Sequence, residues 1–390
     1  MQGRRYVLVG AIWAAWAGAV LATIAVGMAA GVYNHATEVP GSPFFPLFSW
    51  DYGWYWTIAH HGYDHIGDRF AFFPLWSWLI RWSGSIPDWQ FAGALTLVGS
   101  ALAFLGVAAG SPAGRPREAA LALACWPGSF ALLLPYPDGL ALAAAAWAAV
   151  LFARGRPLVA APLGFVVALL RPNGFLIALP LLLLSRRRGL SYKLAALTPV
   201  AGVVLVELFF WKRSGNAGAF FHAQQYWGRR GPGGAGHWAN EAWHVFARHA
   251  VVIAPLVVVA VVVGVLAWRR FGWLPTVVGA YVCALPLLLA ATTSLHSLVD
   301  SARCALVLPL LLVLWRLGPR YRPWAAFATA VVGLLLASGL IKSFGRQSLF
   351  AFPLFWAIAD GPAWLRRREL AVAGFAANLG LALLLTRFAP

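Results

Sequence analysis

Long apolar stretches recur from one end of this 390-residue chain to the other. The hydrocarbon core of a bilayer is about 30 Å thick, and a helix rising about 1.5 Å per residue needs about 20 apolar residues to cross it. Hydrophobic residues make up 61% of the chain and charged residues only 11%, unlike the balance in soluble domains. The pattern predicts an all-α polytopic membrane protein that forms a single domain over residues 1–390.

Short, mostly basic loops separate the predicted membrane helices, of which we expect about 11–13. The ranges are 7–31, 91–110, 117–135, 137–153, 192–211, 249–268, 273–291, 303–317, 323–341, 346–359 and 369–387. The first range is too long for a signal-peptide core, so we expect it to be retained as a span. The segment 157–185 is interrupted by the sequence RPNG at 171–174. This interruption favours two half-helices over one crossing, because broken backbone at membrane depth is tolerated where it lines a cavity.

The arginines indicate how the chain is oriented. The formal net charge of +18 comes mostly from short loops between spans, which argues for the positive-inside bias and against nucleic-acid binding. This bias predicts an integral membrane protein whose N-terminus is cytoplasmic. It also predicts that the first large loop, 32–90, and the second, 212–248, lie together on the non-cytoplasmic face, along with the RPNG break and the loops 292–302 and 342–345.

The first large loop carries the strongest candidate for catalysis. Ser49 can cap a helix from about Trp50 to His61, and Gly62 can end it. Asp51 then lies in the first turn, where the helix macrodipole favours an ionised carboxylate, as a general base requires. The alternative is that Asp51 only caps a helix end beside the lipid headgroups. The candidate substrate contacts from this helix are Trp50, Trp54, Tyr55 and His61.

We expect this first helix to be amphipathic and to lie in the membrane interface rather than to span. A second interfacial segment is predicted from Phe70 to Trp82, with Pro74 near a helix start. The same loop contains His60, Asp64, His65 and Asp68, whose residue types and i, i+4 spacing could suit a divalent cation such as Zn or Mn. Solvated histidines are the alternative, and we expect no cofactor. The three cysteines lie in or beside apolar segments without metal-ligand spacing and are expected only to pack.

Cationic residues recur in the other loops predicted on this face. Guanidinium groups bind phosphate oxygens in a bidentate fork, so several of them around one cavity would suit a phosphate at headgroup depth. The candidate phosphate ligands are Arg171, Arg229, Arg230, Arg303, Lys342 and Arg346. Each one alone is also explained as an interfacial anchor that snorkels to water. Asp138, Asn173 and His222 are further candidates for substrate contact, although Asp138 could equally end a helix or hold an arginine.

Five motifs together resemble those of a known family. They are WDYGWYWTIAHHGY with AFFPLW, PGS with PYPDGL, RPNG, AFFHAQQYWGRR and SFGRQSLFAFPLF. In this order they span nearly the whole chain and resemble the PIG-V family, of the GPI mannosyltransferase II type, in its bacterial, chiefly actinobacterial form.

The resemblance implies a GT-C-type bundle in a bacterial plasma membrane that transfers mannose from polyprenyl-phosphate-mannose to a glycolipid or glycan acceptor on the non-cytoplasmic face. It also implies that Asp51 matches the acidic residue that deprotonates the acceptor. Two departures leave the acceptor open: the family often has Glu where this chain has Asp138, and its tyrosine-proline pattern after AFFP is here Trp76-Ser77-Trp78. A flippase for lipid-linked sugars is the alternative, because broken helices around a polar cavity would serve it as well.

Overall fold

The computed structural model describes residues 2–33, 45–63, 67–227, 295–337 and 343–385. Every regular element in these ranges is a helix. In chain order they are α1 (Gln2–Ala29), η2 (Phe45–Phe48), α2 (Asp51–His61), η3 (Gly67–Ala71), α3 (Pro74–Arg81), α4 (Asp88–Ala109), α5 (Pro116–Ala124), η4 (Ser129–Leu133), α6 (Asp138–Ala153), α7 (Pro157–Leu170), η5 (Pro172–Ile177), α8 (Ala178–Ser185), α9 (Leu190–Ser214), α10 (Ala219–Tyr226), α13 (Leu295–Arg316), η7 (Pro319–Tyr321), α14 (Arg322–Ala337), α15 (Phe344–Ser348), α16 (Pro353–Asp360), η8 (Ala363–Arg366) and α17 (Arg368–Leu383).

Three helices in the described ranges are long and apolar enough to cross a membrane. They are Gly3–Ala29 within α1, Asp88–Ala109 and Leu190–Ser214. The apolar helices Asp138–Ala153, Pro157–Leu170 and Pro172–Ser185 are shorter than a full crossing. The described chain is therefore all-helical with candidate membrane spans, as the apolar pattern predicts. The predicted spans 249–268 and 273–291 lie outside the described residues.

Two predicted spans are not continuous helices, and a proline stands at each division. The range 117–135 is divided: α5 ends at Ala124, and η4 begins only after the turn at Pro127 and Gly128. The range 346–359 is also divided, since α15 ends at Ser348 and α16 begins at Pro353. Proline lacks the backbone N–H that an inner helical position needs but suits the first turn, so the apolar run restarts there as a separate helix.

Two predicted local features are also wrong. The range 292–302 was expected to be a loop, yet α13 begins at Leu295, well before the predicted start of the span at residue 303. Ser49 was expected to cap α2, but the cap residue is Trp50, and it makes no side-chain cap bond. The predicted end of α2 at Gly62 is confirmed, with a left-handed φ of 73° that favours glycine.

The RPNG break forms as predicted. α7 ends at Leu170, and Arg171 is extended, with φ −145° and ψ 139°, as a residue before proline prefers. The chain then turns through η5 into α8. Gly174 packs so closely on the end of α7 that a Cβ there would overlap the backbone of Val167. The segment 157–185 is therefore two half-helices with a kink between them.

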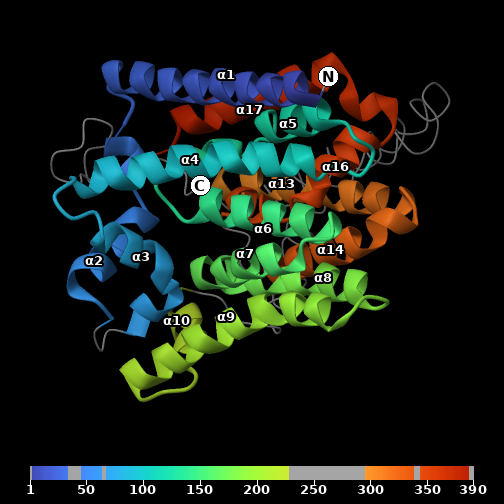
Figure 1. Cartoon of the computed structure of the whole chain (residues 1–390). Coiled ribbons are helices and arrows are strands. Elements are labelled where there is room, and N and C mark those ends of the chain that lie inside the picture. The colour runs from blue at the N-terminus through green and yellow to red at the C-terminus, as the bar shows by residue number, and fades with distance from the viewer. Residues whose placement is uncertain (1, 34–44, 64–66, 228–294, 338–342, 386–390) are drawn as a thin grey trace, which may run out of the picture.

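Small residues bring the central helices together. α4 packs on α6, α6 on α7 and α7 on α9, and these helices lie as a layer across the view in Figure 1. A Cβ at Gly99 would lie 2.8 Å from the backbone nitrogen of Leu140, and one at Gly106 would lie 2.9 Å from Ala146. Because water does not drive helices together inside a membrane, such close backbone contact through small residues is how they associate.

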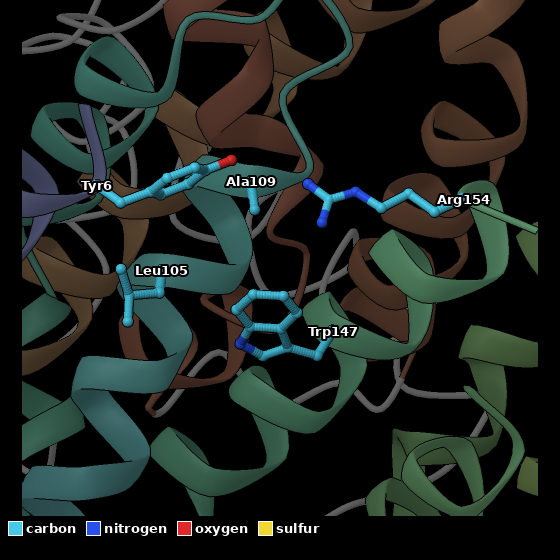
Figure 2. A pocket seen from close by; sticks show the side chains of 5 residues that line it. All are labelled: Tyr6, Leu105, Ala109, Trp147 and Arg154. Atoms are coloured by element: carbon cyan, nitrogen blue, oxygen red, sulfur yellow. The ribbon is translucent and has the colours of Figure 1, made fainter. Parts of the chain in front are cut away.

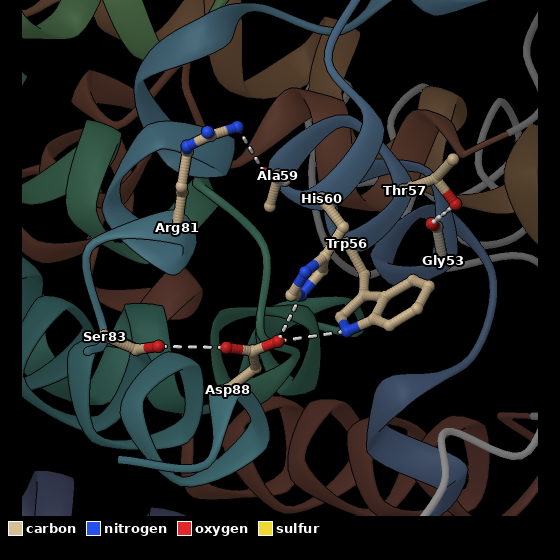
Figure 3. A network of polar contacts seen from close by, with 8 residues as sticks. All are labelled: Gly53, Trp56, Thr57, Ala59, His60, Arg81, Ser83 and Asp88. Atoms are coloured by element: carbon tan, nitrogen blue, oxygen red, sulfur yellow. Dashed lines mark hydrogen bonds and ion pairs between the residues drawn. The ribbon is translucent and has the colours of Figure 1, made fainter. Parts of the chain in front are cut away.

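α2 and α3 lie together at one end of the bundle, at the left in Figure 1. Asp88, the first residue of α4, ties α2 to that end. Its carboxylate accepts hydrogen bonds from Trp56 Nε1 at 3.0 Å, His60 Nε2 at 2.6 Å and Ser83 Oγ at 2.9 Å (Figure 3). An ionised carboxylate only accepts, so His60 carries its proton on Nε2. The C-terminal half of α2 is therefore fixed to α4.

Asp88→Ala removes all three acceptor bonds and should lower the free energy of unfolding by about 2–3 kcal/mol, since each bond contributes about 1 kcal/mol. Ser83→Ala, the control, removes one bond and should cost about 1 kcal/mol. Thermal unfolding of the detergent-solubilised protein measures both. Equal losses in the two variants would contradict the role assigned to the Asp88 carboxylate.

Candidate active site

Asp51 is the first residue of α2 and follows a strained residue. Trp50 has φ 59° and ψ −119°, a positive φ that a bulky residue rarely adopts and that costs of order 1–3 kcal/mol. The Trp50 indole Nε1 donates to the carbonyl oxygen of Leu385 at 2.9 Å, beyond the end of α17. This contact with the C-terminal region holds the strained turn, which in turn fixes where the Asp51 carboxylate leaves the backbone.

The Asp51 carboxylate forms an ion pair with Arg346, nearly 300 residues later in the chain. Asp51 Oδ2 lies 2.6 Å from Arg346 Nη2, and the two side chains are 27% and 10% exposed. The Arg346 guanidinium lies over the ring of Tyr136, 5.0 Å from its centroid. Its Nε is buried and has no hydrogen-bond partner among the described residues. One edge of this guanidinium is therefore free to donate.

Charge and burial act in opposite directions on Arg346. Burial disfavours the charged form of its guanidinium, but the nearby carboxylates of Asp51 and Asp138 favour the charge and outweigh burial. Arg346 therefore stays positively charged. Burial raises the pKa of Tyr136 well above its ordinary value, so its hydroxyl stays neutral and donates to the backbone oxygen of Ser49 at 2.6 Å. Tyr136 thus joins the approach to α2 to the loop before α6.

A second ion pair lies beside the first and is more deeply buried. Arg171, in the RPNG break, pairs through Nη1 with Asp138, the first residue of α6, and the side chains are only 7% and 6% exposed. Arg171 Nε donates to Asn173 at 3.2 Å, and Nη2 donates to Gln347. The ring of Phe350 lies 5.6 Å from the Arg171 guanidinium carbon. Two of the alternatives considered for Asp138 therefore hold together: it stands at the start of a helix, and it pairs with an arginine.

The sequence links the two pairs, because Arg346 and Gln347 are neighbours in α15. Arg303 in α13 fixes this short helix from another side. Its Nε donates to the carbonyl oxygen of Pro127 at 3.0 Å, and a Cβ at Gly345 would overlap its guanidinium. A Cβ at Gly128 would lie 3.0 Å from the Gly345 oxygen. Arg303 therefore holds the turn between α5 and η4 against α15.

The other predicted substrate contacts are distributed more widely. Trp54 stacks on Phe72 with ring centroids 5.9 Å apart, and buried Tyr55 meets the same ring edge-on at 5.2 Å. His61 is exposed at the far end of α2, and His222 in α10 lies 2.8 Å from Asn216. Trp54 and Tyr55 therefore share one aromatic neighbour, and Tyr55 also lies near Tyr136, with ring centroids 6.5 Å apart, whereas both histidines are exposed. The candidate residues outside the described ranges are Asp64, His65, Arg229, Arg230 and Lys342.

The described residues contain no group of three or more His, Cys, Asp or Glu placed to hold a metal. Of the weak metal candidates, His60 bonds to Asp88 instead. Asp68 is buried in η3, with one carboxylate oxygen unpartnered in the described chain, and Trp227 donates to its backbone oxygen at 3.3 Å. The structure therefore does not bring His60 and Asp68 together as metal ligands.

A cavity of about 590 Å³ lies away from the ion pairs. It is lined by Tyr6, Leu105, Ala109, Trp147 and Arg154 (Figure 2). Arg154 directly follows α6 and Asp138 begins it, so about 24 Å of helix separates this side of the cavity from Asp138, at about 1.5 Å per residue. Its lining contains no acidic side chain. The chemistry that the sequence predicts therefore belongs to the Asp51 end.

Sequence reasoning missed three residues that organise the site: Tyr136, Gln347 and Asp88. Tyr136 and Gln347 stand next to or near residues that the motifs single out, in PYPDGL and SFGRQS, and that proximity was the available signal. Asp88 lies outside every motif, and only the geometry shows its role.

Asp138→Ala would leave the buried Arg171 guanidinium without its carboxylate, and should lower the free energy of unfolding by about 3–5 kcal/mol. A matched double variant, Arg171→Met with Asp138→Leu, removes both charges and should recover more than half of that loss. Thermal unfolding in detergent separates the two outcomes. If both variants lose the same stability, the pair is not what holds these segments together.

A scan against models of known protein families finds no match to this chain, and a search of curated proteins finds no matching sequence. The likeness to the PIG-V family is therefore carried by the five sequence motifs alone. The function has to be argued from those motifs and from the geometry of the Asp51 site.

Proposed function

We propose that this chain is an inverting GT-C-type mannosyltransferase of a bacterial plasma membrane. It would use polyprenyl-phosphate-mannose as donor and a lipid-linked or glycan molecule as acceptor, on the non-cytoplasmic face. The observation that carries the proposal is the pairing of a partly exposed carboxylate, Asp51, with a buried guanidinium that keeps one free donor, Arg346. Such a pair supplies both a proton acceptor and a phosphate ligand.

The reaction assigns one role to each group. The acceptor hydroxyl oxygen attacks the anomeric carbon, the bond from that carbon to the phosphate oxygen breaks, and its electron pair leaves with the polyprenyl phosphate. Asp51 takes the hydroxyl proton, a general-base role that typically contributes 10²–10⁴ in rate. The transition state is oxocarbenium-like, as in glycosidases. Because the leaving group is a phosphate, no general acid is needed.

Arg346 stabilises the negative charge that develops on the departing phosphate. A fixed cation in a water-poor site acts more strongly there than it would in water, and needs no reorganisation during the reaction. Tyr136 holds the plane of this guanidinium, and Arg171 with Asp138 supports the adjacent backbone. Arg229, Arg230 and Lys342 remain proposed donor ligands outside the described residues.

The proposed architecture is a GT-C-type bundle of about 11–13 transmembrane helices, on the basis of apolar runs about 20 residues long. α2 and α3 act as interfacial helices of the first loop. Broken segments such as α7–η5–α8 and α15–α16 line the proposed substrate chamber, where irregular backbone at membrane depth is tolerated.

A flippase for lipid-linked sugars is the second candidate, and one observation favours it. Glu207 lies within the candidate span α9, and one of its carboxylate oxygens is buried without a partner in the described chain. An ionisable group inside a membrane span is a functional candidate by default. Labelled-lipid translocation that persists without Asp51 but requires Glu207 would support the flippase.

Asp51→Asn should insert and fold normally but lose transfer by at least about 100-fold, because an amide cannot take the acceptor proton. The measurement is transfer of radiolabelled mannose from polyprenyl-phosphate-mannose in proteoliposomes. Glu369→Gln, at an exposed position at the start of α17, is the matched control and should keep full activity. Full transfer by the Asp51→Asn protein would rule out the proposed mechanism.

Transfer should continue in the presence of excess EDTA. The proposed mechanism assigns proton acceptance to Asp51 and charge stabilisation to Arg346, so no step depends on a divalent ion. The assay compares initial rates with and without chelator, and then after adding back Mn²⁺ or Mg²⁺. A loss of activity that only the added metal restores would instead support the metal-dependent alternative at the histidines of the first loop.

A further inference from the structure

The two ion pairs differ in how completely their arginines are bonded. Arg171 uses Nε, Nη1 and Nη2 on three different side chains, and a ring lies beside its guanidinium. Arg346 is nearly as buried, yet within the described part of the chain its one ion-pair partner is Asp51, and its Nε has no hydrogen-bond partner there. An arginine carries five N–H donors in a rigid fork. Arg346 therefore has donor capacity that Arg171 lacks.

The carboxylates differ in the same way. Asp138 is 6% exposed, so losing its arginine would leave a charge buried. Asp51 is 27% exposed, so water can solvate its carboxylate if Arg346 binds another anion. Replacing Asp51 by another anion on Arg346 therefore costs less free energy than replacing Asp138 on Arg171.

We propose that Asp51 and the phosphate of the lipid-linked donor compete for the Arg346 guanidinium, so that Asp51 is released to act as base only when the donor phosphate replaces it. This inference rests on the proposed function and adds an order to it: the donor must bind before the acceptor is deprotonated. Asp51 Oδ2 faces the guanidinium and cannot take an acceptor proton at that atom while the pair persists.

The geometry explains why a phosphate can win this competition. A phosphodiester has two unesterified oxygens that match the fork of an arginine, and the unpartnered Nε supplies the second prong beside Nη2. The Tyr136 ring, 5.0 Å from the guanidinium carbon, keeps the fork in place while its partner changes. One carboxylate contact is thereby exchanged for a bidentate one.

The test measures binding rather than transfer. The full chain is reconstituted in nanodiscs, and the dissociation constant of a long-chain polyprenyl phosphate without sugar is measured by intrinsic tryptophan fluorescence. Asp51→Asn should bind this lipid at least threefold more tightly than the unmodified protein, because the competing carboxylate is gone. The Asn carbonyl can still accept from Nη2, so the variant should fold. Equal or weaker binding by Asp51→Asn would overturn the competition.

A double-mutant cycle separates competition from a general effect of removing a negative charge. In an Arg346→Met background, Asp51→Asn should leave the affinity unchanged, since there is nothing left to compete for. Arg346→Lys, tested as a single variant, keeps the charge but loses the fork. It should bind the polyprenyl phosphate at least fivefold more weakly than the unmodified protein. The same tightening by Asp51→Asn in the Arg346→Met background would overturn the proposal.

Two further outcomes distinguish a failure of the proposed function from a failure of the competition alone. If the unmodified protein does not bind polyprenyl phosphate at all, the proposed function fails along with the competition. If it binds, but Asp51→Asn has no effect, only the competition fails. Inorganic phosphate is measured in parallel, and we expect it to bind far more weakly than the lipid. Equal affinity for the two would contradict the assignment of the site to a lipid phosphate.

Discussion

A single contact between distant parts of the chain organises this structure: the ion pair of Asp51 with Arg346. It joins the first loop, at the start of α2, to a short helix near the C-terminus. Burying a guanidinium is costly unless an acceptor or a counter-charge lies close, so the Asp51 carboxylate stabilises the fold around Arg346. That requirement explains why a carboxylate stands in the first turn of α2 and why the strained Trp50 is tolerated before it.

The neighbouring pair of Arg171 and Asp138 performs a different task. Its hydrogen bonds to Asn173 and Gln347 connect the RPNG break, the start of α6 and α15 in one buried network. A network in which every guanidinium nitrogen is bonded specifies one arrangement and resists exchange with other anions. The fully bonded arginine thus supports the site, whereas the incompletely bonded one is available for chemistry.

Sequence patterns predicted the elements that depend on local information. The 20-residue apolar runs gave α1, α4 and α9, and the residue preference before proline gave the kink at Arg171. Apolar runs could not show that α5 and α15 end early, because hydrophobicity does not distinguish a span from two short helices around a proline. Nor could the sequence pair Asp51 with Arg346 or His60 with Asp88, since those partners are fixed by tertiary packing between distant segments.

Contacts at the far end of α16 help to hold Arg346 in position. Asp360, the last residue of that helix, accepts from Ser111 Oγ at 3.1 Å and from Tyr321 OH at 2.9 Å. Burial, reinforced by the Asp360 carboxylate, raises the pKa of Tyr321 to about 12, so this hydroxyl stays a donor. α16 follows α15 after four residues, so Asp360 at one end and Arg303 at the other fix the segment that carries Arg346. The guanidinium is therefore the fixed member of the pair with Asp51, and any exchange of partner has to occur by movement of the carboxylate.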